Sequence, residues 1–259
     1  MDQMVKSKSA GLLAHELTGS GETTVVFLHG VFMDRHLWDD IVIDGVQRLV
    51  VDMPGHGASD PVSAATIEDH VAAVAQLLDD YQLESPIIVG HSWGGMVALR
   101  LAQKRSLGGV VFTNTPLRRT AGTSRLGFHA QRAMLALGLP AATYGKLAAS
   151  SLIGEATRKR QPELVEAAAV RAERIGRSGL SDTLRSVLLE PDDSLDLLAQ
   201  LDAPWTFVAG RDDYVLANGT GDDIGNLGDL VLVDGAHTTP IEAPLDLVRI
   251  INDFLEQHA

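Results

Sequence analysis

Residues 87–95 read IIVGHSWGG and contain the pattern Gly-x-Ser-x-Gly centred on Ser92. A continuous apolar run precedes the serine, and a helical run beginning MVAL follows it. A serine on so tight a strand-to-helix turn has strained backbone angles, and the residues two positions before and after it must be small. Gly90 and Gly94 meet that demand. The turn raises the hydroxyl above the sheet at a helix N-terminus, where negative charge is stabilised. We therefore predict a nucleophilic serine, with a structural loop as the alternative.

The composition is that of a soluble globular protein with one large α/β domain or two small ones. The chain has 259 residues, of which 45% are hydrophobic and 21% charged. No apolar run reaches the roughly 18 residues of a membrane span, and residues 1–15 lack the pattern of a signal peptide. There is no cysteine, which excludes disulfides, a thiolate nucleophile and cysteine-based zinc sites. We expect a cytoplasmic protein with no membrane partner.

The net charge of −13 disfavours nucleic acid as a partner. We expect the partner to be a small-molecule substrate, and the oligomeric state stays open.

Six short apolar runs alternate with helical patterns along the chain. Continuous apolar runs are typical of parallel strands covered on both faces. We expect strands at residues 23–28, 48–52, 86–89, 109–112, 205–209 and 230–233. We expect helices at residues 67–78, with Thr66 as N-cap, and at residues 96–104 and 245–255. This alternation predicts an α/β fold with a mostly parallel, doubly wound sheet.

Residues 117–190 break the alternation, because their patterns are helical only. We expect a helical insertion there, leaving residues 1–116 and 191–259 as the core. The insertion holds 12 of the 21 Lys and Arg but only six of the 34 Asp and Glu. It therefore carries a net positive charge, whereas the rest of the chain carries a net negative charge. Solvated helix faces explain this simply. The alternative is an arginine that pairs with a substrate carboxylate, with Arg118, Arg171 and Arg174 as candidates.

A serine hydroxyl needs a base to accept its proton, and the base needs an orienting acid. The apolar run 205–209 is followed by Gly210, Arg211, Asp212 and Asp213, and the run 230–233 is followed closely by His237. The carboxyl ends of parallel strands meet at one edge of the sheet, where Ser92 also lies. We predict His237 as the base and Asp213 as the acid, with Asp212 as a competitor. We expect a structural role for His36, and a solvated side chain for His70.

The same chemistry needs two backbone N–H groups directed at the developing oxyanion. Trp93 supplies one, because it follows the nucleophile directly. The second is expected from Val31, after the strand that ends in His29 and Gly30, with Phe32 as the alternative. Phe32 and His91 are also expected to contact substrate.

Taken together, five ordered motifs resemble the α/β-hydrolase superfamily over nearly the whole chain. The motifs are LHG at 28–30, DMPGHGAS at 52–59, GHSWGG at 90–95, GRDD at 210–213 and GAH at 235–237. The resemblance implies an α/β-hydrolase fold, places the acid at Asp213, implies structural roles for Asp52 and His56, and implies a helical cap at residues 117–190.

This resemblance implies a serine hydrolase that acts on a small, largely apolar carboxylic ester or lactone. A serine at position 92 argues against haloalkane dehalogenase and epoxide hydrolase chemistry, which use aspartate there. The glycine-rich HGGG loop of some esterases is absent around Val31. A C–C bond hydrolase of a diketone acid and a non-enzymatic ligand sensor are the alternatives. Neither a metal nor an organic cofactor is implied.

Overall fold

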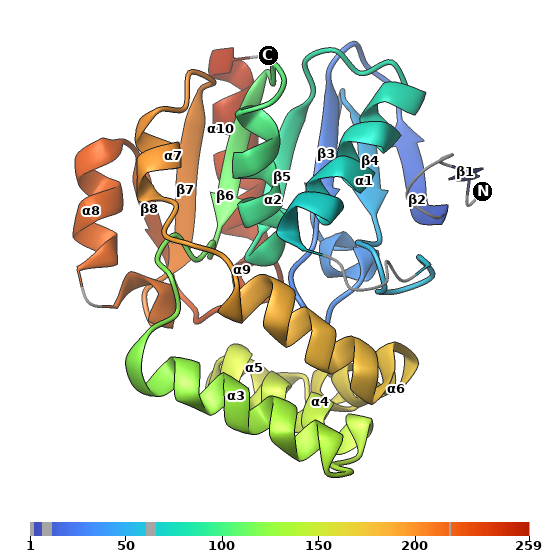
Figure 1. Cartoon of the computed structure of the whole chain (residues 1–259). Coiled ribbons are helices and arrows are strands. Elements are labelled where there is room, and N and C mark those ends of the chain that lie inside the picture. The colour runs from blue at the N-terminus through green and yellow to red at the C-terminus, as the bar shows by residue number, and fades with distance from the viewer. Residues whose placement is uncertain (1–2, 7–11, 61–65, 218, 259) are drawn as a thin grey trace.

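The computed structural model describes residues 3–6, 12–60, 66–217 and 219–258. Within these residues eight strands form one sheet in the order β1-β2-β4-β3-β5-β6-β7-β8 (Figure 1). The strands are β1 (Gln3–Lys6), β2 (Leu12–Gly19), β3 (Thr24–Leu28), β4 (Gln47–Val51), β5 (Ile87–His91), β6 (Gly109–Thr113), β7 (Trp205–Gly210) and β8 (Leu230–Val233). Strands β3 to β8 are parallel, and β2 is antiparallel to both β1 and β4.

The mostly parallel sheet predicted from the apolar runs is confirmed, and all six predicted strands are present. Strands β1 and β2 were not predicted. Strand β2 reads LLAHELTG, which mixes polar and apolar residues. It therefore lacks the continuous apolar pattern of a strand buried on both faces, as is common for antiparallel strands near a sheet edge.

Helices cover both faces of the sheet. One face packs against α1 (Ile67–Asp80), α2 (Trp93–Ala102), α7 (Leu195–Ala199) and α8 (Thr220–Leu227). The other face packs against η1 (Arg35–Trp38) and α10 (Pro244–His258). Figure 1 shows α1 and α2 in front of the sheet and α10 behind it. The central strands are buried on both faces, which explains their uninterrupted hydrophobicity.

Helix α1 begins where the sequence predicts. The Thr66 hydroxyl accepts a hydrogen bond from Asp69 N–H at 3.4 Å, and the Asp69 carboxylate accepts one from Thr66 N–H at 2.7 Å. This reciprocal cap supplies partners for N–H groups that the first turn of a helix leaves unpaired. The expectation that His70 is solvated is wrong, because its side chain is buried, edge-on to the Trp93 indole at 4.7 Å.

Residues 117–190 contain no strand and form a layer of helices below the sheet (Figure 1). They are α3 (Gly122–Ala136), α4 (Ala141–Leu152), α5 (Glu155–Arg160), α6 (Glu163–Thr183) and η2 (Leu184–Leu189). Helices α4 and α6 approach closely at Gly145, where an added Cβ would lie 2.5 Å from Ala168 O. The first residue of this segment is joined to the chain just beyond its last residue, because Ser194 N–H donates to Leu117 O at 2.7 Å. We refer to residues 117–190 as the helical segment.

None of the helices in the described part of the chain has the length and hydropathy needed to cross a membrane.

Candidate active site

Ser92 occupies the turn between β5 and α2 with φ 50° and ψ −112°, a conformation that is unusual for a residue with a side chain. Its neighbouring glycines are required by close contacts. A Cβ added to Gly90 would lie 2.7 Å from Gly95 Cα, and a Cβ added to Gly94 would lie 2.1 Å from Leu28 O. The strained turn therefore depends on the two glycines that the sequence places around the serine.

The structure brings Ser92, His237 and Asp213 together from three loops at the same sheet edge. His237 Nε2 lies 3.0 Å from Ser92 Oγ, and His237 Nδ1 lies 2.9 Å from Asp213 Oδ1. All three residues are buried, whereas Asp212 is exposed. Because an ionised carboxylate only accepts hydrogen bonds, Nδ1 carries the proton and Nε2 is left to accept from the serine hydroxyl. This arrangement can draw a proton from the serine as its oxygen attacks a carbonyl.

Asn114, which the sequence analysis did not single out, holds the carboxylate in place. It follows β6 with φ 51°, and its side-chain N–H₂ donates to Asp213 Oδ2 at 2.6 Å. The Thr239 hydroxyl donates to Asn114 Oδ1 at 2.6 Å, which sets the orientation of the amide. Val215 N–H donates to Asp213 Oδ1 at 3.1 Å, so both carboxylate oxygens accept hydrogen bonds. The available signal was a polar residue at the carboxyl end of a buried strand.

Tyr214 is a second residue that the sequence analysis missed. Its ring stacks on the His237 imidazole with a centroid separation of 4.7 Å and an interplanar angle of 28°. Its hydroxyl lies 3.4 Å from His237 Nε2. The stacked ring limits how far the imidazole can rotate away from Ser92.

The loop after β3 passes directly beside the serine. An added Cβ at Gly30 would lie 3.2 Å from Ser92 Cβ, and Phe32 adopts φ 62° two residues later. Val31 and Phe32 line the cavity above Ser92, and Trp93 begins α2 immediately after it. These positions are compatible with N–H donation to an oxyanion from Val31 and Trp93, which stays a prediction.

His29 fastens this loop to the neighbouring turn. Its Nδ1 donates to Gly30 O at 2.7 Å, and its Nε2 accepts from Met53 N–H at 2.9 Å, so a neutral ring has both nitrogens paired. Burial lowers the pKa of His29, which favours that neutral form. Asp52 accepts from Arg35 N–H at 2.7 Å and from Ala58 N–H at 2.9 Å, contacts that stabilise the turn.

His91, which we expected to contact substrate, does not line the cavity. Its side chain is fully buried, and its Nδ1 lies 3.1 Å from the Thr113 hydroxyl. The ring packs behind His237 at a centroid distance of 5.4 Å. The imidazole is therefore enclosed by protein, whereas Ser92 lines the cavity.

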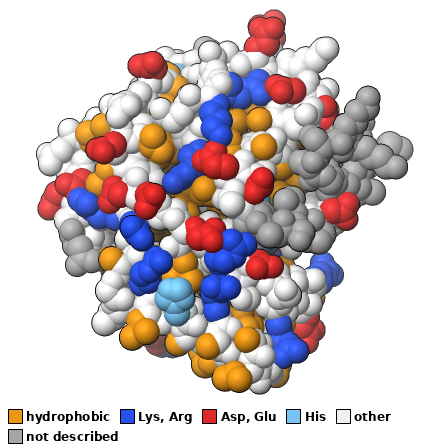
Figure 2. Space-filling view, in the orientation of Figure 1, with side chains coloured by type: hydrophobic (Ala, Val, Ile, Leu, Met, Phe, Trp, Pro, Cys, Tyr) orange, Lys and Arg blue, Asp and Glu red, His pale blue; other side chains and the backbone are white. Residues whose placement is uncertain are grey.

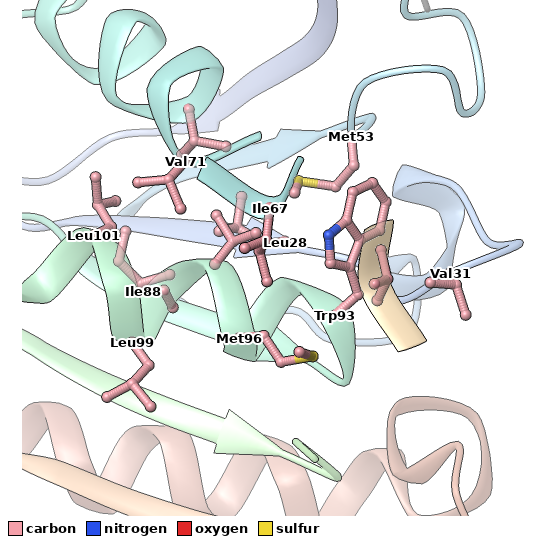
Figure 3. Close-up of a cluster of buried hydrophobic side chains, with 14 of the residues drawn as sticks. Leu28, Val31, Met53, Ile67, Val71, Ile88, Trp93, Met96, Leu99 and Leu101 are labelled. Carbon is pink, nitrogen blue, oxygen red and sulfur yellow. The ribbon is translucent and has the colours of Figure 1, made fainter. Parts of the chain in front are cut away.

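Three buried histidines surround the indole of Trp93, at centroid distances of 6.2 Å for His29, 5.1 Å for His56 and 4.7 Å for His70. Figure 3 shows the indole beside Met53 within a cluster of buried hydrophobic side chains. Burial lowers the pKa of His56 to about 3 and that of His70 to about 4. These rings therefore stay neutral in the folded protein at pH values where an unfolded histidine is protonated.

This difference predicts that the free energy of unfolding falls as the pH drops from about 6.5 to about 4. Below pH 6.5 the unfolded chain takes up a proton on His70 that the folded chain cannot accept until about pH 4. Urea unfolding at pH 7 and pH 4.5 measures the loss, which is on the order of 3 kcal/mol for His70 alone. The His70→Gln variant should lose less stability on acidification, while His129→Gln, at an exposed position, should follow the wild type. Equal acid sensitivity of His70→Gln and wild type would contradict the assignment.

A cavity of about 640 Å³ lies between Ser92 and the helical segment. Residues 1–116 and 191–259, which we call the body, contribute lining residues that include Val31, Phe32, Ser92, Tyr214 and Val215. The helical segment contributes mainly apolar side chains such as Leu117, Phe128, Leu139 and Leu147. A side cavity of about 290 Å³ shares Val31 and Phe32 with it. A cavity of this size with a mainly apolar lining and some polar groups is typical of a small-molecule site.

Each arginine that lines these cavities has a carboxylate partner. Arg118 and Arg119 line the main cavity, Arg171 lines the side cavity, and Arg174 is among the lining residues of neither. The pairs are Arg118 with Asp193 and Asp223, Arg119 with Asp192, and Arg171 with Asp34 at 2.7 Å. Figure 2 shows Lys and Arg side chains interspersed with Asp and Glu where the helical segment meets the body. The three arginines at the cavities therefore each face an acid from outside the helical segment.

Comparison with known proteins gives concordant results. Residues 23–244 match the family described as the alpha/beta hydrolase fold. A thermophilic esterase from Thermogutta terrifontis superposes with a TM-score of 0.86 at 23% identity, covering 100% of both chains. The enol-lactonase from Burkholderia xenovorans LB400 superposes with a TM-score of 0.83 at 19% identity, covering 96% of this chain and 98% of its own.

One sequence relative is 2-succinyl-6-hydroxy-2,4-cyclohexadiene-1-carboxylate synthase from Escherichia coli, 38% identical over 80 residues, which are 30% of this chain and 32% of that protein. The chain spans about a quarter to a third of the length of the curated relatives that it matches first.

Proposed function

The chain belongs to the alpha/beta hydrolase family, and on that premise we propose that it is a serine hydrolase that cleaves a small, largely apolar carboxylic ester or lactone. The observation that carries this proposal is the hydrogen-bonded relay from Ser92 through His237 to Asp213, with separations of 3.0 and 2.9 Å. The relay opens onto the apolar cavity.

In the proposed reaction Ser92 Oγ attacks the substrate carbonyl while His237 Nε2 takes its proton. Asp213 stabilises the imidazolium that forms. The N–H groups of Val31 and Trp93 bind the oxyanion of the tetrahedral intermediate. His237 then returns the proton to the leaving oxygen, which releases the alcohol and leaves an acyl-enzyme. A water molecule activated by His237 hydrolyses the acyl-enzyme and restores the serine.

We propose that the helical segment, residues 117–190, acts as a cap that selects the substrate. Most residues that line the main cavity come from it, whereas the reacting groups come from residues 1–116 and 191–259. The substrate would therefore be recognised mainly by the apolar faces of α3 and α4, and its carbonyl would be placed by the body.

The charge balance around the cavities favours a neutral substrate. Because Arg118, Arg119 and Arg171 are each paired, a carboxylate entering the main cavity would lose its hydration without gaining an unpaired cation. This argues against the diketone-acid alternative. The relay, in turn, argues against a sensor without catalytic activity, because a ligand-binding site does not require a base aligned with a serine.

We expect para-nitrophenyl acetate, butyrate and a simple lactone to be hydrolysed. We also expect kcat/KM for a para-nitrophenyl alkanoate to exceed that for its ω-carboxylate analogue by about 10-fold or more, because burying an unpaired charge in an apolar cavity is costly. Release of para-nitrophenol, corrected for the spontaneous rate, measures both at low and high salt.

A preference for the ω-carboxylate ester that weakens at high salt would instead indicate that an arginine binds the substrate carboxylate. Absence of turnover on every ester and lactone, together with no labelling by a fluorophosphonate, would refute the proposed function.

A further inference from the structure

The loop that carries His237 is held by a carboxylate outside the relay. Glu242 is half-buried at the end of α9 (Thr239–Glu242). Its Oε2 accepts from Ala236 N–H at 2.8 Å and from Thr238 N–H at 3.0 Å, the two residues that flank His237. One side chain thus fixes the backbone on both sides of the proposed base.

The same carboxylate reaches the helical segment. Glu242 Oε1 accepts from the N–H of Gly154, between α4 and α5, at 2.6 Å. An added Cβ at Gly154 would lie 2.6 Å from Glu242 Oε1, so a larger residue there would displace the carboxylate. Hydrogen bonds to a charged acceptor are shorter and stronger than neutral ones, and Glu242 makes three.

The backbone of His237 makes the second link to the helical segment. Its N–H donates at 3.3 Å to the carbonyl oxygen of Leu152, which is the last residue of α4. Three successive amides, from Ala236 to Thr238, therefore point either to Glu242 or to α4. The base and the helices over the cavity share one hydrogen-bonded junction, formed by residues 152–154, residues 236–238 and Glu242.

We propose that Glu242 is a positioning residue that ties the helical segment to the loop of His237, so that the imidazole reaches its alignment with Ser92 only while these helices are seated over the cavity. This inference rests on the proposed role of His237 as the base. Displacing a reacting group by about 1 Å can cost roughly 100-fold in rate, which is the scale at which a loosened loop would act.

Substitution of Glu242 tests the tie. The amide of Glu242→Gln has one oxygen acceptor and an N–H₂ group that would face a backbone N–H, so at least one bond is lost. We expect kcat to fall about 10-fold in Glu242→Gln and about 100-fold in Glu242→Ala, with KM changed less than about threefold. Glu256→Gln, at an exposed position of α10, is the matched control and should retain the wild-type kcat.

The junction can also be disturbed from the helical segment. Gly154→Ala keeps the N–H but places a methyl group against the Glu242 carboxylate. We expect a fall in kcat similar to that of Glu242→Gln, and little further loss when the two are combined, because both break the same contact. Gly127→Ala in α3, where an added Cβ meets nothing within 4 Å, is the control. Full additivity of Gly154→Ala and Glu242→Gln would overturn the coupling.

A readout without substrate separates this inference from the proposed function. An imidazole N–H that donates to a buried carboxylate gives a far-downfield proton resonance, so the NMR spectrum reports the His237–Asp213 bond directly. We expect this resonance to broaden or shift in Glu242→Gln and Gly154→Ala and to persist in both controls. If the wild type proves inert on esters, the proposed function fails while the spectra still test the tie. If the wild type is active and Glu242→Gln keeps its kcat and its resonance, the inference fails alone.

Discussion

Replacing Ser92 by alanine should lower kcat on a para-nitrophenyl ester by on the order of 10⁵- to 10⁶-fold, because no other group supplies the oxygen that forms the acyl-enzyme. The turn itself should survive, since alanine adds no atoms beyond Cβ and the glycines that permit the turn are unchanged. Intact-protein mass after treatment with a fluorophosphonate should show one added group on the wild type and none on Ser92→Ala.

Ser106→Ala provides the matched control, because Ser106 is exposed and lies away from the cavity. It should be labelled and should turn over ester as the wild type does. Stoichiometric labelling of Ser92→Ala would show that another residue is the nucleophile. A thermal melt of each variant distinguishes lost chemistry from lost folding.

Replacing Asp213 by asparagine should lower kcat by on the order of 10⁴-fold, because the carboxylate that supports the imidazolium and holds its tautomer is lost. The surroundings sharpen this expectation. Both oxygens of Asp213 accept hydrogen bonds, from Asn114 and Val215 as well as from His237. Whichever way the new amide turns, its N–H₂ group faces a donor. Either it opposes the Asn114 amide, or it forces His237 into the wrong tautomer.

Asp212→Asn is the built-in control, because Asp212 is the adjacent residue, carries the same charge and is exposed. Its kcat should stay within about twofold of the wild type, since surface substitutions away from such contacts have small effects. Steady-state kinetics on one neutral ester suffice for the comparison. The reverse ranking of the two variants would move the acid to Asp212.

Part of this molecule was predictable from local patterns. The six parallel strands were found because burial on both faces leaves an uninterrupted apolar run in the sequence. The start of α1 was found because a cap is formed by residues three positions apart. The turn at Ser92 was found because its two close contacts each demand glycine. The placement of Ser92, Asp213 and His237 at one sheet edge followed from parallel strands ending there, and their catalytic roles stay predictions.

Other features depend on contacts between distant parts of the chain. His70 has the polar character of a solvated residue, yet it is buried because Trp93 packs against it. His91 adjoins the nucleophile, yet its side chain is buried and does not line the cavity. The roles of Asn114 and Glu242 become visible only when residues about 100 positions apart meet, as in the Asn114–Asp213 bond and the Gly154–Glu242 bond.

The sequence by itself therefore determined the six parallel strands of the sheet, the nucleophile turn and which strand ends carry the predicted serine, acid and base, since these follow from periodicity and from steric demands within a few residues. Tertiary structure decided which carboxylate meets His237, which arginines are neutralised and how the helical segment joins the loop of the base. Hydrogen bonds and ion pairs between side chains depend on distance in space. For residues far apart in the chain, that distance is set by the folded structure and cannot be derived from their spacing in the sequence.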